Sequence, residues 1–151
     1  MGKRLAHEIK NYIENYLDEY QQENLILNLV GHSMGGVVAR AALPHLQEYR
    51  SSMGFFCSLS SPHLGYLNGV SGLVKLGLWA IRKWKNIRSL EQLSMEEKGD
   101  PRKTLLYELS QTGHLRYFRK VILLSSFEDS YVSWHSARIS SSKATNSDSK
   151  V

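Results

Sequence analysis

Apolar and polar residues alternate along this chain in segments that predict helices and strands in turn. Near the N-terminus, apolar and tyrosine side chains recur every three or four residues, the spacing of an amphipathic helix: Leu5, Ile9, Tyr12, Ile13, Tyr16, Leu17 and Tyr20. Three short apolar runs predict strands: Leu25–Val30, Met53–Leu59 and Val121–Leu124. The first run is apolar on both faces except at Asn28, which is typical of a strand buried in a parallel sheet. We expect the third strand to be buried as well.

Helix-forming segments separate these strands. We expect helices from Met34 to about Leu43, from about Leu73 to Lys85, from Thr104 to Ser110 and from Tyr131 to Ile139. Pro44 ends the first of them, because proline lacks an N–H and crowds the preceding turn. Strands that alternate with helices predict an α/β fold, with a parallel sheet and flanking helices. The irregular segment 65–72 and the polar segment 94–103 are predicted connections.

Length and composition agree with one folded domain. The chain has 151 residues, of which 42% are hydrophobic. We expect residues 1–139 to form the domain and the Ser- and Lys-rich residues 140–151 to be a disordered tail. No run approaches the ~18 apolar residues of a membrane span, and the N-terminus has no apolar signal core. With Cys57 as the single cysteine, no internal disulfide can form, so we expect a cytoplasmic setting.

The net charge of +5 has a local source in the segment Lys75–Arg88, which carries five basic residues and no acid. The favoured interpretation is a helix that packs its apolar stripe on the core and has an ordinary charged surface. The other is a lid helix that makes peripheral membrane contact through its basic residues and Trp79. No nucleic-acid-binding motif is present, so we exclude that class of partner. We also expect no metal and no cofactor.

The chemistry concentrates in Gly31-His32-Ser33-Met34-Gly35, which lies between the first strand and its helix. A Gly-x-Ser-x-Gly motif in this context predicts a nucleophile elbow, in which the serine hydroxyl projects above the sheet. Gly31 and Gly35 are expected to keep the strand and the helix from colliding at the turn. The Met34 N–H is expected to form half of an oxyanion hole. The alternative is a Gly-Ser turn at the start of an ordinary helix.

A serine nucleophile needs a base, and the base needs an orienting acid. Asp129 follows the third strand, which is where the acid lies in hydrolases with this elbow. It could instead be a capping or turn aspartate. Glu128 and Asp100 are weaker alternatives for the acid.

The base is harder to assign among the six histidines. We expect His7 and His45 on the surface and His114 in a connection, while His32 cannot readily turn its ring onto Ser33. His63 either lines the pocket or is a structural loop residue. Together with Met34, both His32 and His63 are candidates for oxyanion or substrate contacts. Only His135 follows Asp129, as the order Ser, Asp, His requires. The alternative is a base on a part of the fold that this chain lacks.

Several segments together resemble the putative serine esterase family of lipase-like α/β-hydrolases, over about residues 3–140. They are Leu29–Gly36, Ser58–Gly65, Gly77–Trp79, Asp100–Arg102, Leu105–Tyr107, Asp129–Val132 and His135–Ile139. The resemblance implies an α/β-hydrolase fold that is truncated at both ends, with Ser33 as nucleophile and Asp129 as acid. Family members carry earlier strands with a His-Gly loop that gives a second oxyanion donor, and a later strand and loop that hold the catalytic histidine. Ser133 stands where the family usually has proline.

Three functions are therefore open. The favoured one is a serine hydrolase that cleaves carboxylic esters, and specifically lipid acyl esters, through an acyl-enzyme on Ser33. The others are a non-catalytic relative that binds lipid or a protein partner, and an incomplete fragment. Replacement of Ser33 by alanine separates the first from the other two.

Overall fold

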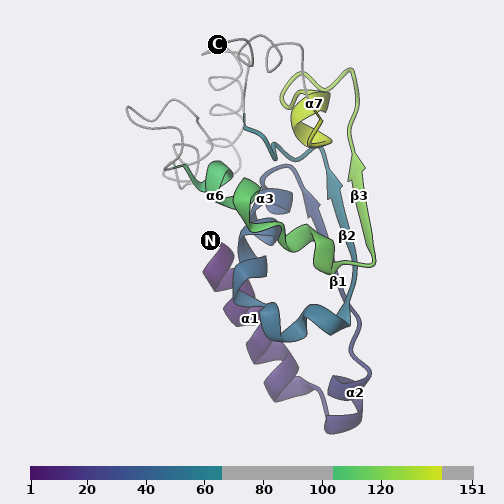
Figure 1. The fold of residues 1–151 in the computed structure, drawn as a ribbon. Helices are drawn as coiled ribbons and strands as arrows, with labels where there is room; N and C mark the ends of the chain where they lie inside the picture. The colour runs from purple at the N-terminus through teal and green to yellow at the C-terminus, as the bar shows by residue number, and fades with distance from the viewer. Residues whose placement is uncertain (66–103, 141–151) are drawn as a thin grey trace.

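The fold is built on a parallel sheet of three strands (Figure 1). The computed structural model describes residues 1–65 and 104–140. The strands β1 (Leu27–His32), β2 (Met53–Leu59) and β3 (Lys120–Leu124) lie in the order β1-β2-β3, and both pairs are parallel. All three coincide with the predicted apolar runs to within two residues. The α/β class is therefore confirmed.

Helices cover one face of this sheet. They are α1 (Gly2–Tyr16), α3 (Met34–Ala42) and α6 (Leu105–Thr112). The 3-10 helices η1 (Leu43–His45) and η2 (Gln47–Ser52) join α3 to β2, and η4 (His114–Tyr117) joins α6 to β3. The core lies between the helices and the sheet, where Phe56 and Leu43 are fully buried. Phe56 packs against Phe118 with ring centroids 5.6 Å apart. This packing fixes α3, and therefore the turn that precedes it, against β1 and β2.

The first helix is shorter than its periodicity predicts. Helix α1 ends at Tyr16, and the chain restarts as α2 (Glu19–Glu23). The Asp18 side chain accepts a hydrogen bond from the Gln21 N–H, and the Gln21 side chain accepts one from the Asp18 N–H. This capping box favours a new helix start over continuation of the old one. Tyr20 therefore belongs to α2.

The prediction that the strands are buried on both faces is wrong within the described residues. Along β1, Leu29 and Gly31 are buried against the helices, whereas Val30, which lies between them, is 63% exposed. On β3, Ile122 and Leu124 are exposed as well. Register pairs Val30 with Cys57 and Cys57 with Ile122, so these side chains share one outer face. The sheet thus has a helix-covered face and an apolar outer face.

The last helix is also shorter than predicted. In place of a helix over Tyr131–Ile139, α7 spans only Trp134–Ala137. Its start is capped by Ser133, whose hydroxyl accepts a hydrogen bond from the Ser136 N–H at 3.3 Å. The chain before it is held in a turn by Asp129 rather than in helical geometry. Serine is a strong helix N-cap, which explains why the helix begins directly after Ser133.

Several predictions lie outside the described residues. These are the helix from Leu73 to Lys85, the basic segment Lys75–Arg88, the connections over 66–72 and 94–103, and the tail after residue 140. Among the helices of the described ranges, none combines the length and the apolar character needed to cross a bilayer.

Candidate active site

Ser33 occupies a strained turn at the carboxyl end of β1. It is the residue between β1 and α3, and its backbone has φ 54° and ψ −126°. A non-glycine residue rarely adopts a positive φ, so the surrounding structure must hold this conformation in place. One such restraint is the Ser33 N–H, which donates to the Leu59 carbonyl at the end of β2 over 2.8 Å. The turn is therefore anchored directly to the neighbouring strand.

Two glycines allow α3 to leave the strand at this angle, and one of them is not the predicted one. A Cβ on Gly31 would collide with the backbone of Gly36, and a Cβ on Gly36 would collide with the Ser61 side chain. A Cβ on Gly35, by contrast, would meet nothing within 4 Å. The expectation that Gly35 prevents a collision is therefore wrong. Gly31 and Gly36 permit the close approach of β1, α3 and the loop after β2.

Asp129 lies at the same edge of the sheet as Ser33. The Ser60 N–H donates to the Leu124 carbonyl over 2.9 Å, so β2 and β3 end side by side. The Ser60 hydroxyl in turn donates to the Asp129 carboxylate. Ser60 also has a positive φ of 46°. Ser60 therefore lies between the strand end that holds Ser33 and the loop that holds Asp129, a role that sequence reasoning missed.

The carboxylate of Asp129 is ionised and well satisfied. One of its oxygens accepts hydrogen bonds from the Tyr131 N–H at 2.9 Å and the Val132 N–H at 3.0 Å. Burial by itself would raise the pKa of Asp129, but these bonds, the Ser60 hydroxyl and the nearby His32 lower it on balance. Asp129 thus serves as a turn aspartate, and its place at the sheet edge is also the one predicted for the acid.

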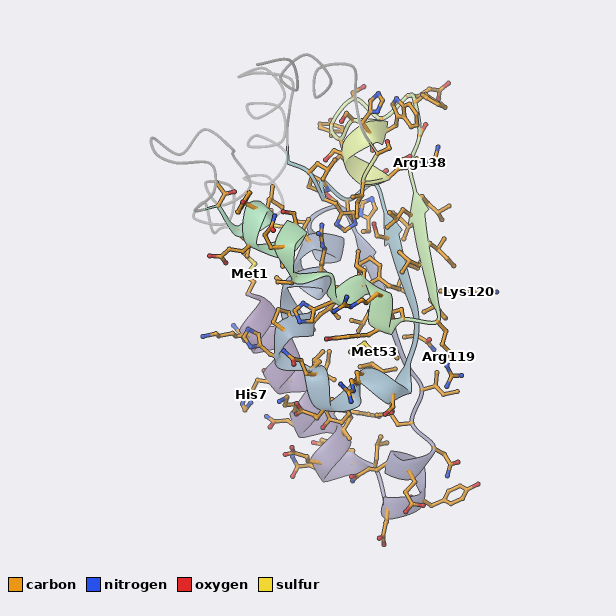
Figure 2. The ribbon with its side chains drawn as sticks, viewed as in Figure 1. Met1, His7, Met53, Arg119, Lys120 and Arg138 are labelled. Atoms are coloured by element: carbon orange, nitrogen blue, oxygen red, sulfur yellow. The ribbon has the colours of Figure 1, made fainter. Side chains whose placement is uncertain are left out.

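All six histidines lie in the described ranges, and none of them forms a hydrogen bond with Ser33 or Asp129. His135 faces the Ser140 hydroxyl at 3.5 Å from Nδ1, and its ring packs on Trp134 with centroids 4.3 Å apart. His32 is exposed on β1 and lies near enough to Asp129 to influence its pKa. His7 is exposed on α1, as Figure 2 shows. His45 and His114 are half-buried.

His63 belongs to a buried polar cluster beneath the Ser33 turn. Its Nε2 lies 2.7 Å from the Ser58 hydroxyl, while its Nδ1 is buried without a partner within the described residues. Burial, assisted by the positive charge of Arg40, lowers the pKa of His63 to about 4, so the ring is neutral at pH 7. This environment favours the structural interpretation of His63 over a substrate contact.

Arg40 completes this cluster and was not singled out from the sequence. Its guanidinium donates to the carbonyls of Leu109 at 2.8 Å and His63 at 3.4 Å. Only 8% of the residue is exposed, and burial lowers the pKa of its guanidinium. Its place among the apolar residues of α3 is the one signal that could have identified it. Arg40 joins α3, α6 and the loop after β2.

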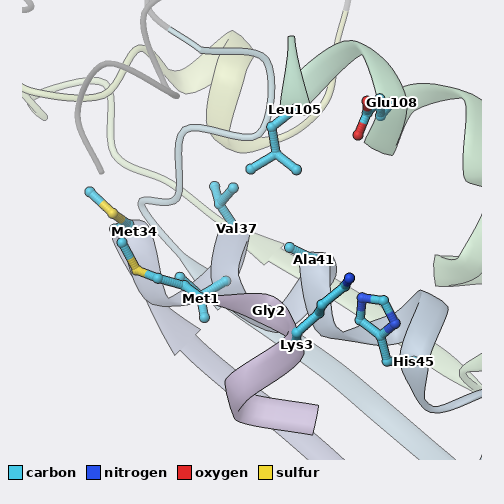
Figure 3. A pocket seen from close by; sticks show the side chains of 10 residues that line it. Met1, Gly2, Lys3, Met34, Val37, Ala41, His45, Leu105 and Glu108 are labelled. Atoms are coloured by element: carbon cyan, nitrogen blue, oxygen red, sulfur yellow. The ribbon is translucent and has the colours of Figure 1, made fainter. Parts of the chain in front are cut away.

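A pocket of about 300 Å³ opens beside Met34, the residue that follows Ser33 (Figure 3). It lies between the start of α1, one side of α3 and the start of α6. Its apolar walls come from Met1, Met34, Val37, Val38, Ala41 and Leu105. Lys3, His45 and Glu108 add charged and polar groups. A cavity of this size and character is at the lower end of those that bind small molecules.

Within the described residues, no group of three or more histidine, cysteine, aspartate or glutamate side chains is arranged to hold a metal ion.

Comparison with known proteins identifies the family. No solved structure matches this chain. The family model described as putative serine esterase matches residues 1–144, which is nearly the whole sequence and includes Ser33, Asp129 and His135. The chain therefore belongs to the putative serine esterase family.

Proposed function

We propose that this protein is a serine hydrolase of α/β-hydrolase fold that cleaves carboxylic esters through an acyl-enzyme on Ser33. The observation that carries the proposal is the Ser33 backbone, whose φ of 54° holds the residue in a tight turn between a parallel strand and a helix. A nucleophile elbow requires this geometry, because it turns the serine side chain out of the strand at the carboxyl edge of the sheet. Ser33 is only 8% exposed, so it lies buried at that edge. Membership of an esterase family supports the same chemistry.

In the proposed reaction, the Ser33 oxygen attacks the ester carbonyl as a base removes its proton. The negative charge that develops on the carbonyl oxygen is stabilised by the Met34 N–H at the start of α3, where helical N–H groups lack intrahelical partners. Collapse of the tetrahedral intermediate expels the alcohol, which takes up the proton. Water then gives a proton to the base and attacks the carbonyl carbon of the acyl-enzyme. The bond between that carbon and the Ser33 oxygen breaks, the oxygen takes the proton back, and the carboxylic acid is released.

Asp129 suits the role of the orienting acid because its lowered pKa keeps it ionised. We assign the base to His135, the only histidine after Asp129 in the chain. In the structure this ring faces Ser140 and Trp134, so it must reorient before it can bridge Asp129 and Ser33. The exposed His32, close to Asp129, is placed to contact substrate.

The pocket beside Met34 supports a lipid acyl ester as substrate. Its walls are largely apolar, and Met34 connects it to the proposed oxyanion donor. Transfer of a hydrocarbon chain from water into such a pocket is favourable in proportion to the apolar surface buried. Peripheral membrane contact through Lys75–Arg88 remains a prediction, since that segment lies outside the described residues.

A non-catalytic relative that binds lipid or a protein partner is the second candidate. The observation that favours it is that no histidine of the chain is hydrogen-bonded to Ser33 or Asp129 in this structure.

Hydrolysis of p-nitrophenyl butyrate separates the two functions. If the protein is a serine hydrolase, Ser33→Ala is expected to abolish turnover, and Asp129→Asn is expected to lower kcat by up to about 10⁴-fold. His135→Gln then tests the base, and Ser130→Ala, at an exposed position in the same loop, serves as the control. Equal turnover by the native protein and Ser33→Ala, with both folded by circular dichroism, would exclude the proposed mechanism.

A further inference from the structure

An aromatic cluster projects from the loop that holds Asp129. Phe127 is 79% exposed, although a phenyl ring gains about 1.5–3 kcal/mol from full burial. Its ring packs against that of Trp134 with centroids 4.8 Å apart, and the Arg138 guanidinium lies 5.4 Å from the Trp134 ring centroid. Tyr131, in the same loop, is also exposed. We name these four residues the Phe127 patch: Phe127, Tyr131, Trp134 and Arg138.

The patch is held in place by its surroundings. The Glu128 N–H donates to the Ser126 hydroxyl at 3.1 Å, and the Asp129 carboxylate fixes the next turn. Val132 is buried beneath this turn. The Ser136 hydroxyl donates to the Gly65 carbonyl over 2.7 Å and so attaches α7 to the loop after β2. The exposure of Phe127 is therefore a built feature of an ordered loop.

The patch also lies next to the proposed site. Its loop follows β3 at the carboxyl edge of the sheet, the edge that carries Ser33. Figure 1 places α7 at this end of the molecule, and Figure 2 shows Arg138 beside it. Lys120 and Arg119 lie near the opposite end of β3. A surface that met the Phe127 patch would therefore meet the end of the molecule that carries Ser33 and Asp129.

We propose that the Phe127 patch inserts into the headgroup region of a lipid surface and presents the site to its ester. This inference rests on the proposed function and specifies the physical form of its substrate. Tryptophan and tyrosine rings favour the membrane interface, and phenylalanine favours the boundary with the acyl chains. Arg138 complements a lipid phosphate, to which a guanidinium donates two hydrogen bonds.

The composition and charge of the patch favour lipid over a protein partner. Its aromatic rings and its guanidinium are the kinds of side chain that lie at the boundary between headgroups and acyl chains. Glu128 is exposed in the same loop and offsets the charge of Arg138. Ring insertion, rather than net positive charge, is therefore expected to drive binding, and the binding is expected to be only weakly sensitive to salt.

The experiment measures binding to phosphatidylcholine vesicles by co-sedimentation. The full chain carries Ser33→Ala, so that ester hydrolysis plays no part in the result. Phe127→Ser is expected to weaken vesicle partitioning about tenfold or more, because one inserted phenyl ring is lost. Phe127→Trp is expected to retain binding. The control is Tyr16→Ser, which removes a 74% exposed aromatic ring at the far end of α1.

Three results would overturn the proposal. They are the absence of vesicle binding by the Ser33→Ala chain, equal binding by Phe127→Ser, and an equal loss of binding in Tyr16→Ser. If analytical ultracentrifugation detected a dimer that forms through Phe127, and no vesicle binding occurred, the occupant of the patch would be a second molecule of this protein rather than lipid. Hydrolysis of a water-soluble ester by Phe127→Ser is expected to match that of the native protein. If the Ser33→Ala chain bound vesicles but the native protein hydrolysed no ester, the result would support the Phe127 patch and contradict only the proposed function.

Discussion

At the level of single residues, the site depends on close packing around the Ser33 turn. Gly31 and Gly36 leave room for β1, α3 and the loop after β2 to approach each other, and Ser60, the first residue of that loop, donates a hydrogen bond to Asp129. The motif predicted the strand, the serine and the helix correctly. It misidentified the second glycine. Gly36, and not Gly35, faces Ser61 because of packing between segments that lie 25 residues apart in the sequence.

Two neighbouring glycines provide a matched test of this packing. Gly36→Ala is expected to lower the free energy of unfolding by about 1–3 kcal/mol, because its methyl group would overlap the Ser61 side chain. Gly35→Ala is expected to be neutral or to stabilise by up to about 1 kcal/mol, since alanine favours the helix and meets no atom. Urea denaturation of both variants measures the difference. Equal effects would show that the packing of α3 on this loop is described wrongly.

Stability should depend on pH through His63. The unfolded chain takes up a proton on His63 near pH 6.5, whereas the folded protein does so only near pH 4. The unfolded state therefore binds more protons between these values, and stability is lost as the pH falls from 6.5 towards 4. The loss attributable to this residue is about 3 kcal/mol.

His63→Gln removes this dependence while it keeps a polar partner for Ser58. The variant is expected to show a flatter curve of unfolding free energy between pH 6.5 and pH 4.5 than the native protein. His7→Gln, at an exposed position, is the control and should follow the native curve. If the unfolding free energy of His63→Gln fell with pH as steeply as that of the native protein, burial would not perturb the pKa of His63 in the native fold.

At the level of secondary-structure elements, the strands were easier to predict than the helix ends. Runs such as Met53–Leu59 are short, apolar and bounded by polar residues, so the strand coincides with the run. The end of α1 at Tyr16 is set by the Asp18–Gln21 capping box, a local competition that the longer periodicity conceals. The brevity of α7 has a similar cause, because Asp129 holds the preceding residues in a turn.

Helix α7 should depend on one serine for its attachment. The Ser136 hydroxyl is fully buried, accepts from the Leu64 N–H at 3.1 Å and donates to the Gly65 carbonyl. Ser136→Ala leaves both backbone groups without this partner and is expected to cost about 1–3 kcal/mol of unfolding free energy. Ser130→Ala, at an exposed position, should stay within about 0.5 kcal/mol of the native protein. Thermal unfolding of both variants measures the difference. Equal stability of the two variants would refute this role for Ser136.

For the whole molecule, the sheet has two unlike faces. The sequence predicted a parallel sheet, but it did not predict which face the helices of the described ranges would cover. The apolar character of Val30 and Ile122 suggested burial, whereas both are exposed in the structure. Apolar composition alone cannot distinguish a covered face from an uncovered one, because that difference depends on which elements pack there.

Adjacent residues of β1 test this assignment. Leu29 lies on the helix-covered face and Val30 on the outer face. Leu29→Thr is expected to lower the free energy of unfolding by about 2–4 kcal/mol, through lost packing and a buried hydroxyl. Val30→Thr conserves shape at an exposed position and should cost no more than about 0.5 kcal/mol. Comparable losses in the two variants, measured by urea denaturation, would show that the outer face is covered.

The assignment of Ser33 as nucleophile is tested most directly by a fluorophosphonate probe, which reacts with activated serines. The intact chain and Ser33→Ala are treated side by side, and each protein is weighed by mass spectrometry. We expect the native chain to gain the mass of one probe adduct on Ser33. We expect Ser33→Ala to gain no adduct. A folded native chain that gains no adduct, or an adduct that persists in Ser33→Ala, would contradict the proposal that this turn activates Ser33.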